Sequence, residues 1–216
     1  MKNFLQLKWM LALLLISVTC SHLSAQNLKE VFSNTETPIT YLGIDFTQAR
    51  LINLSELPSD IRDRHYPAIN DLIVNEPKKY DVAGAFNKSN INSDIGLVAK
   101  RNATINLEEM KSTNTADYNR LKSSDIDKLV SGFDFAGKKG IGLLFVMDGM
   151  SKANKGAGMW VTLVDMATKK VLLTEMIVGK TSIGFGFRNY WANPVEEVIK
   201  QIGKKKYKEW KASYGG

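Results

Sequence analysis

The sequence predicts an α/β fold (α+β): a single mixed sheet of about five strands, with a parallel first half and a C-terminal antiparallel three-stranded meander, packed with helices. An alternating apolar segment at residues 40–53 predicts the first strand. Three apolar runs at residues 140–150, 158–167 and 170–179, joined by short polar connections, predict the meander. Apolar stripes with helical spacing between these strands predict the helices that cover the sheet.

The first segment reads TYLGIDFTQARLIN, and its apolar Leu42, Ile44 and Phe46 recur at every second position. This is the period of a strand with one well-buried face. A helical region follows, divided by Pro67 and Pro77. Two apolar stripes predict its helices, namely Ala68, Ile69, Leu72 and Ile73, then Tyr80, Ala83 and Phe86.

Residues 94–100, DIGLVAK, are expected to form a short second strand. The patterns Asn106-x-x-Glu109 and Ser124-x-x-Asp127 predict two short helices that begin in the manner of a capping box. Residues 140–150, GIGLLFVMDGM, are apolar at nearly every position, as expected of a strand covered on both faces.

The last two strands, GMWVTLVDMA and KVLLTEMIVG, are expected to meet at a turn around Thr168 and Lys169, while SKANKGAG joins the first of them to the strand before it. The final helix is expected to begin at Asn193, with Pro194 in its first turn. Its buried face consists of Val195, Val198, Ile199 and Ile202.

These elements fit one α/β domain at residues 40–206, with a lead segment at 26–39 and a basic C-terminal tail at 207–216. Their order is strand, helices, strand, helices, three strands, helix. The first three strands can therefore lie parallel through right-handed crossovers, and the meander extends one side.

Residues 1–25 have the pattern of a secretory signal peptide: Lys2 and Lys8, an apolar run at 9–18, and a small-residue segment ending at Ala25. The run is shorter than the roughly 20 residues that cross a bilayer, so no transmembrane segment is expected. The mature protein is expected to be exported, to the periplasm or the extracellular space. Cys20 offers an alternative, lipid anchoring, although the residues before it match that signal poorly.

The formal net charge of +7 is unevenly distributed along the chain. Residues 1–25 hold two lysines and no acidic residue, and residues 200–216 hold six lysines against Glu209 alone. The remaining body is formally neutral, which argues against a nucleic-acid-binding domain. The lysine-rich end could contact anionic lipid or an acidic partner, or it could complement a helix dipole.

Cleavage after Ala25 removes Cys20 and His22 and leaves His65 as the one histidine of the mature chain. Disulfides, cysteine nucleophiles and multi-histidine metal sites are then excluded within one chain, and no metal or cofactor is expected. His65 is expected to be an ordinary surface histidine, since no nucleophile motif such as G-x-S-x-G accompanies it.

The segment GKTSIGFGFRNYWANP, residues 179–194, combines glycines with aromatic rings. It lacks the third glycine of a dinucleotide fingerprint, since Asn189 stands there. In a structural interpretation the rings fasten the last helix to the core; in a functional one they form a stacking surface for a glycan or small ligand. The structural interpretation is favoured because buried aromatics are the ordinary case. The candidate binding residues are Phe185, Phe187, Arg188, Tyr190 and Trp191.

Asp45 and Asp148 are expected at the ends of neighbouring strands, so a carboxylate pair for acid–base hydrolysis is conceivable. Aspartates at strand ends more often cap turns or face water. No catalytic motif supports the pair, and the sequence therefore favours a non-enzymatic protein.

In its order of elements, with a glycine-led central strand, a meander and a closing helix, the chain resembles the α/β domain shared by the TolB amino-terminal domain and curli-secretion-type lipoproteins of Gram-negative envelopes. The resemblance covers about residues 40–206 and implies no binding residues. The segments YLGIDF and GFGFRNYW are also similar to those of a family of secreted bacterial proteins, which implies no activity. Together with export and the absence of a catalytic constellation, the resemblance leads to the expectation of a binding or scaffolding domain for other envelope components. The alternative is a glycan- or small-ligand-binding module that uses the aromatic stretch from Phe185 to Trp191.

Overall fold

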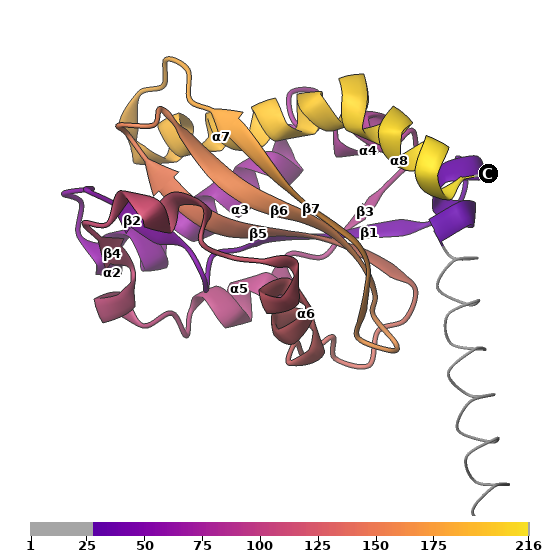
Figure 1. Cartoon of the computed structure of the whole chain (residues 1–216), viewed down its shortest axis with the longest axis horizontal. Coiled ribbons are helices and arrows are strands. Elements are labelled where there is room, and N and C mark those ends of the chain that lie inside the picture. The colour runs from indigo at the N-terminus through magenta and orange to yellow at the C-terminus, as the bar shows by residue number, and fades with distance from the viewer. Residues whose placement is uncertain (1–27, 216) are drawn as a thin grey trace, which may run out of the picture.

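The computed structural model describes residues 28–215 (Figure 1). The expected signal peptide and Cys20 lie outside these residues. Residues 28–33 are helical. The elements that follow are β1 (Ile39–Asp45), β2 (Arg50–Ile52), α2 (Pro58–Asp60), η1 (Ile61–His65), α3 (Tyr66–Asn75), α4 (Val82–Ala85), β3 (Asn92–Ser93), α5 (Gly96–Asn102), η2 (Leu107–Glu109), β4 (Lys111–Ser112), η3 (Thr115–Asn119), α6 (Ser123–Ser131), β5 (Ile141–Ser151), β6 (Gly156–Asp165), β7 (Lys170–Lys180), α7 (Gly186–Gln201), η4 (Ile202–Lys206) and α8 (Tyr207–Tyr214).

Strand β5 organises the sheet. Along one of its edges β1 pairs in parallel with Ile141 to Val146, and β2 pairs in parallel with Gly149 to Ser151. Along the other edge β6 pairs antiparallel over the whole length of β5. Strands β1 and β2 therefore follow one another along the same edge, and residues 46–49 form a break between them.

The two-residue strands β3 and β4 pair in parallel with the outer edges of β1 and β2. The seven strands of the described chain thus occupy five rows, which confirms a mixed sheet of about five strands with a parallel first half. The meander β5–β6–β7 is confirmed as well. Its second turn lies where Thr168 and Lys169 were expected, and Lys169 has a left-handed backbone there (φ 56°).

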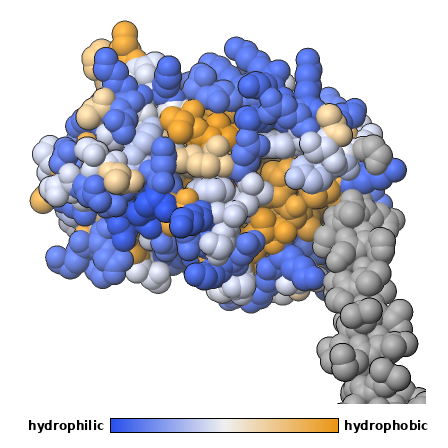
Figure 2. All heavy atoms as spheres, in the orientation of Figure 1, coloured by the Kyte–Doolittle hydropathy of each residue, from blue (hydrophilic) through white to orange (hydrophobic). Residues whose placement is uncertain are grey.

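Helices cover both faces of the sheet (Figure 1). On one face α3 and α7 pack with apolar side chains of β1, β5 and β6 in the larger core cluster. On the other face α5 and α6 form a second cluster with Leu42, Leu144 and Val146. They leave part of that face open, since Trp160 and Val171 are only half-buried, and Figure 2 shows apolar surface over this part of the sheet.

The expected strand at residues 94–100 is wrong. Gly96–Asn102 is helix α5, and the strand beside it is the two-residue β3 just upstream. The buried side chains of this segment are Leu97, Val98 and Asn102, and Val98 and Asn102 are four positions apart, the spacing of one helix face. The parallel pairing expected for a second strand is made by Asn92 and Ser93 instead.

The expected start of the last helix at Asn193 is also wrong, because α7 begins seven residues earlier, at Gly186. Gly186 has a positive φ of 76°, a backbone conformation that glycine adopts without strain, and it turns the chain into the helix. Asn193 lies inside α7 and donates its side-chain amide to the carbonyls of Ser182 and Ile183. Pro194 is inside the helix as well.

The two expected capping boxes differ in outcome. Asn106 caps the short helix η2 and accepts the Glu108 backbone N–H at 3.2 Å. Helix α6 begins at Ser123 instead of after Ser124, and the carboxylate that reaches back is Asp125, which accepts the Lys122 N–H at 3.0 Å.

Helix α7 continues through η4 into α8, so that residues 207–214 are helical. Tyr207 and Trp210 are buried against the ring of Phe32 from the helix at residues 28–33. The two ends of the described chain therefore pack on one another, as Figure 1 shows on its right-hand side.

Two buried amides replace a missing strand beside β1. Strand β3 ends early, and beyond it the Ile44 N–H donates to Asn70 Oδ1 at 2.7 Å, while the Ile44 carbonyl accepts from Asn70 and Asn102 at 3.1 and 3.0 Å. The Phe46 N–H donates to Asn102 Oδ1 at 2.8 Å. Buried backbone groups require partners, and α3 and α5 supply them here.

Candidate functional site

The aromatic segment places its rings in different environments. Trp191 is 1% exposed, as the structural interpretation expects, and Phe187 and Tyr190 are half-buried. Phe185 is 88% exposed, and Ile183, before it, is 93% exposed. Arg188 is exposed and donates to its neighbour Asn189 at 3.0 Å. The segment therefore has a buried anchor and an exposed rim.

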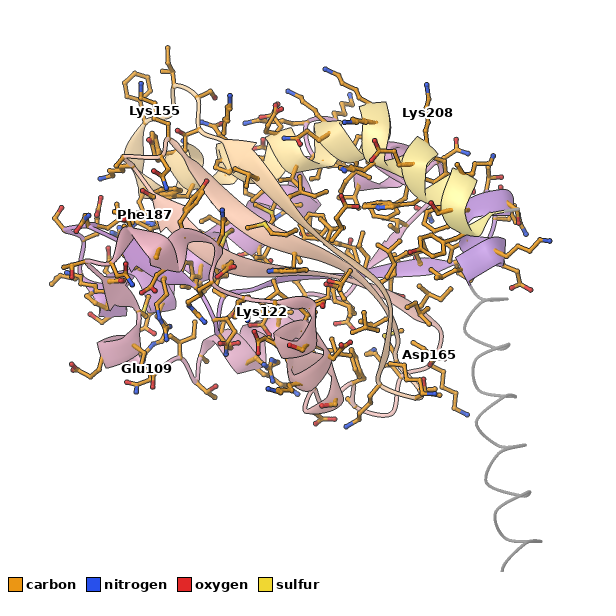
Figure 3. The ribbon with its side chains drawn as sticks, viewed as in Figure 1. Glu109, Lys122, Lys155, Asp165, Phe187 and Lys208 are labelled. Atoms are coloured by element: carbon orange, nitrogen blue, oxygen red, sulfur yellow. The ribbon has the colours of Figure 1, made fainter. Side chains whose placement is uncertain are left out.

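The loop before α7 is held close to the helix. Gly184 lies against the Tyr190 backbone, where a Cβ atom would approach Tyr190 Cα within 2.9 Å. The Thr181 hydroxyl donates to the Tyr190 hydroxyl at 3.2 Å, and the Thr181 N–H donates to the Lys155 carbonyl at 2.8 Å. These contacts bring Phe187 and the loop that carries Lys155 to the same end of the molecule (Figure 3).

A pocket of about 240 Å³ lies beside this segment, and we call it the aromatic pocket. Phe187, Tyr190 and Trp191 line it together with Glu56 and Lys152, which come from the β2–α2 connection and the β5–β6 turn. The rings of Tyr190 and Trp191 meet edge to face, with centroids 5.0 Å apart. The pocket thus has an aromatic wall and a charged wall.

The charged wall is an ion pair: Lys152 Nζ lies 2.7 Å from Glu56 Oε1. Burial alone would raise the pKa of Glu56, but the hydrogen bond from Lys152, backbone N–H groups and the lysine charge together lower it, so the carboxylate is ionised at neutral pH. Its second oxygen, Oε2, is buried and has no hydrogen-bond partner among the described residues. The indole N–H of Trp191 is likewise buried without a partner within residues 28–215.

His65 supports the aromatic wall from outside. Its ring stacks on Phe187 with centroids 4.7 Å apart, and its Nε2 lies 3.2 Å from an Asp60 carboxylate oxygen. Burial is the largest influence on the His65 pKa and lowers it, the Asp60 charge opposes this, and the Arg64 charge adds to it. His65 is therefore half-buried, and its ring supports the pocket wall by packing against Phe187.

Asp45 and Asp148 lie at the break between β1 and β2. Asp45 is buried at the end of β1, where one carboxylate oxygen accepts from the backbone N–H and hydroxyl of Thr47 and the other accepts from Arg101 Nε at 2.7 Å. Both oxygens of Asp45 are thus engaged in fixing the chain that leaves the strand.

Asp148 is also fully buried, and it is the extra residue of a β-bulge between Met147 and Gly149 in the β5–β6 pairing. Its Oδ2 accepts the Leu121 N–H at 3.0 Å. Burial raises the pKa of Asp148. The Leu121 N–H, the Arg120 charge and the Trp160 indole oppose this rise, although Oδ1 and the indole N–H have no hydrogen-bond partner among residues 28–215. The two aspartates therefore lie in the same region but differ in their contacts: both oxygens of Asp45 accept hydrogen bonds, whereas one oxygen of Asp148 has no partner among the described residues.

Sequence reasoning missed Glu56 and Lys152, because charged residues in connections carry no signal until the fold brings them together. The arginines beside the aspartates, Arg101 and Arg120, were missed for the same reason. Among residues 28–215 no group of three or more histidine, cysteine, aspartate or glutamate side chains could hold a metal ion. In the same range no helix combines the length and apolarity that crossing a bilayer requires.

A comparison with known protein families found none whose model matches this chain, and a comparison with curated proteins found no match either. The function is therefore inferred from the geometry of these sites.

Proposed function

We propose that the protein is an exported, non-enzymatic binding domain and that the aromatic pocket holds one sugar ring of a glycan. The observation that carries the proposal is that the half-buried rings of Phe187 and Tyr190 line one pocket together with the Glu56–Lys152 ion pair. A sugar ring presents C–H groups that pack on aromatic faces and hydroxyl groups that donate to a carboxylate. Lys152 supplies donors for hydroxyl oxygens of the same ring.

The size of the pocket agrees with one ring. Its volume of about 240 Å³ is below the range of roughly 300–1,000 Å³ that is typical of pockets for drug-sized ligands. A longer glycan would extend over Phe185 and Ile183, whose exposed side chains lie next to the pocket in the chain. These two residues therefore form the rim of the proposed site.

Export and an envelope location belong to the same proposal. They are supported by the signal-like residues 1–25 and by the resemblance of the element order to TolB-type and curli-secretion-type domains. Because the resemblance is one of element order alone, it supports the compartment and not the ligand.

Isothermal titration against a panel of neutral, amino-sugar and acidic oligosaccharides tests the proposal. Phe187→Ala should weaken binding by roughly 1–3 kcal/mol, by analogy with base stacking on aromatic rings. Glu56→Gln should weaken it as well, because an amide is a poorer acceptor than a carboxylate. Tyr214→Ala, which removes an exposed ring of α8, is the matched control. Binding of no oligosaccharide, or an equal loss in the control, would contradict the proposal.

Phe185→Ala is a second variant for the case in which Phe187→Ala disturbs the fold by removing the ring that stacks on His65. The Phe185 side chain is 88% exposed, so its removal should leave the fold intact and still weaken the retention of longer glycans. Thermal melts of each variant distinguish lost binding from lost structure.

A second candidate function, scaffolding of envelope proteins, is favoured by the exposure of Ile183 and Phe185 side by side. Large apolar side chains so close together at a protruding loop are typical of a protein contact. Pull-down from envelope extracts should recover a partner with the wild-type protein and lose it with Ile183→Ser/Phe185→Ser. Repeated recovery of the protein alone would count against this candidate.

A further inference from the structure

A second cavity, of about 390 Å³, lies beyond the carboxyl end of β1, and we call it the arginine cavity. Gln48, in the break after β1, lines it together with Arg101 at the end of α5 and with Arg120 and Lys128 from the η3–α6 region. Lys122, labelled near the centre of Figure 3, lies between η3 and α6 in that region.

The place of this cavity in the fold is informative. From β1 the chain passes to β3 on one side of β1 and then to β5 on the other, with α3 on one face of the sheet and α5 and α6 on the opposite face. The strand order therefore reverses beside β1, whose carboxyl end lies opposite Val146, while β5 continues to Ser151 beside β2. In open α/β sheets ligands bind in the crevice beside the carboxyl end of a strand at such a reversal.

The charge of the lining is positive. Arg101, Arg120 and Lys128 face the cavity with one carboxylate, Asp125. The Asp125 carboxylate also accepts a backbone N–H at 3.0 Å and lies 3.9 Å from Lys128 Nζ. Arg101 is fixed from behind by its ion pair with Asp45.

Arg120 is the side chain of the cavity best placed to bind an anion. It is half-buried, and no carboxylate lies within 4.0 Å of its guanidinium among residues 28–215. One terminal nitrogen donates to the Gln48 carbonyl, while Nε is buried without a partner in this part of the chain. Burial lowers the pKa of Arg120 and the like charge of Arg50 lowers it further, while the charges of Asp148, Asp117 and Asp125 raise it from beyond ion-pair distance. A half-buried guanidinium with no carboxylate in direct contact is costly, and a bound anion would reduce that cost.

We propose that the arginine cavity binds a phosphate group, as free phosphate or as the monoester of a small organic alcohol, with Arg120 as its principal donor. A planar guanidinium offers two parallel N–H groups to phosphate oxygens, and Lys128 adds a mobile positive charge at the rim. Leu121 and Leu129 line the rest of the cavity and leave an apolar space for the alcohol of a monoester. This site is separate from the aromatic pocket and does not depend on the function proposed there.

Isothermal titration of the full chain at low ionic strength tests the proposal, with inorganic phosphate and glycerol phosphate as the probes. The wild type should bind at least one of them, and the stronger probe distinguishes free phosphate from an ester. Arg120→Gln should weaken binding by about tenfold or more, since charge-assisted hydrogen bonds are lost. Lys128→Gln should weaken it by a smaller factor and leave the fold intact, because its side chain is 81% exposed.

Lys100→Gln is the matched control, since it removes one exposed positive charge from α5 without touching the cavity. Unchanged binding in this control, with the two losses above, supports the site. If neither probe binds the wild type, or if Lys100→Gln weakens binding as much as Lys128→Gln, the proposal is overturned. Phe187→Ala should bind phosphate normally, which separates this outcome from the glycan proposal.

Discussion

At the scale of single residues, similar side chains that are close in the sequence differ in burial and therefore in their contribution to stability. Trp191 is an anchor buried in the core, whereas Phe185, six residues earlier, faces solvent. The same contrast holds for the amides, since Asn70 satisfies the backbone of β1 and Asn75 on the same helix is exposed. Residue type alone does not distinguish these tasks, but stability measurements do.

Trp191→Ala should lower the free energy of unfolding by roughly 3–5 kcal/mol, because it leaves a void in the core. Phe185→Ala should change it by less than about 0.5 kcal/mol, as is usual for surface positions. Chemical denaturation of both variants measures the difference. Similar midpoints for the wild type and Trp191→Ala would contradict the anchor role.

Asn70→Ala should cost about 1–3 kcal/mol, because the buried Ile44 N–H would lose its partner. Asn75→Ala, at an exposed position of α3, serves as the control and should be close to neutral. Urea denaturation of the pair measures the effect. A neutral Asn70→Ala would mean that water or another group replaces the amide without loss.

The pH dependence of stability should include a contribution from His65. Its folded pKa is lowered from 6.5, chiefly by burial, so the unfolded chain binds more protons below that pH. The contribution of His65 to the free energy of unfolding is therefore fully present above the unfolded pKa of 6.5. It is lost as the pH falls from 6.5 through the folded pKa. His65→Gln should show a smaller loss of stability between about pH 7.5 and about pH 5.5. Equal losses in the wild type and the variant would refute this assignment.

At the scale of elements, the contact between β7 and α7 determines where the aromatic segment lies. A Cβ atom at Gly179 would lie 2.0 Å from the Pro194 carbonyl oxygen, so strand and helix touch through their backbones. Asn193, next to Pro194, holds the loop before α7 in place through its hydrogen bonds to the Ser182 and Ile183 carbonyls.

Gly179→Ala should therefore destabilise the protein by about 1–3 kcal/mol or more, because the clash involves backbone that has no room to move. Gly96→Ala is the control: its nearest neighbour would be 3.5 Å away, and alanine favours the helix α5. Thermal melts of both variants are sufficient. A Gly179→Ala protein as stable as the wild type would show that α7 shifts without cost.

The elements also show what the sequence could predict. The long strands were recognisable from their apolar runs, and so was the meander, because short connections leave little choice of topology. The helix α5 was misassigned because in a seven-residue segment a few apolar side chains fit both periods. Pro194 suggested a helix start, because proline is favoured in the first turn of a helix, but α7 begins eight residues before it.

At the scale of the whole molecule, the candidate sites depend on contacts between distant segments. Glu56 and Lys152 are 96 positions apart, and the arginine cavity joins residues from the break after β1 to others on α5 and α6. The sequence pointed to Phe187 and Asp45 but not to their charged partners. Those partners could be found only after the sheet had assembled.

The central claim is that the aromatic pocket binds a sugar, and the indole N–H signals of a ¹⁵N-labelled protein test it most directly. Trp191 N–H has no partner in the described chain, whereas Trp210 N–H is held by Glu175 at 2.6 Å. On titration with the oligosaccharide panel, the Trp191 signal should shift and saturate, while the Trp210 signal should stay in place. A Trp191 signal that does not move with any glycan, or that moves only in step with Trp210, would contradict the claim.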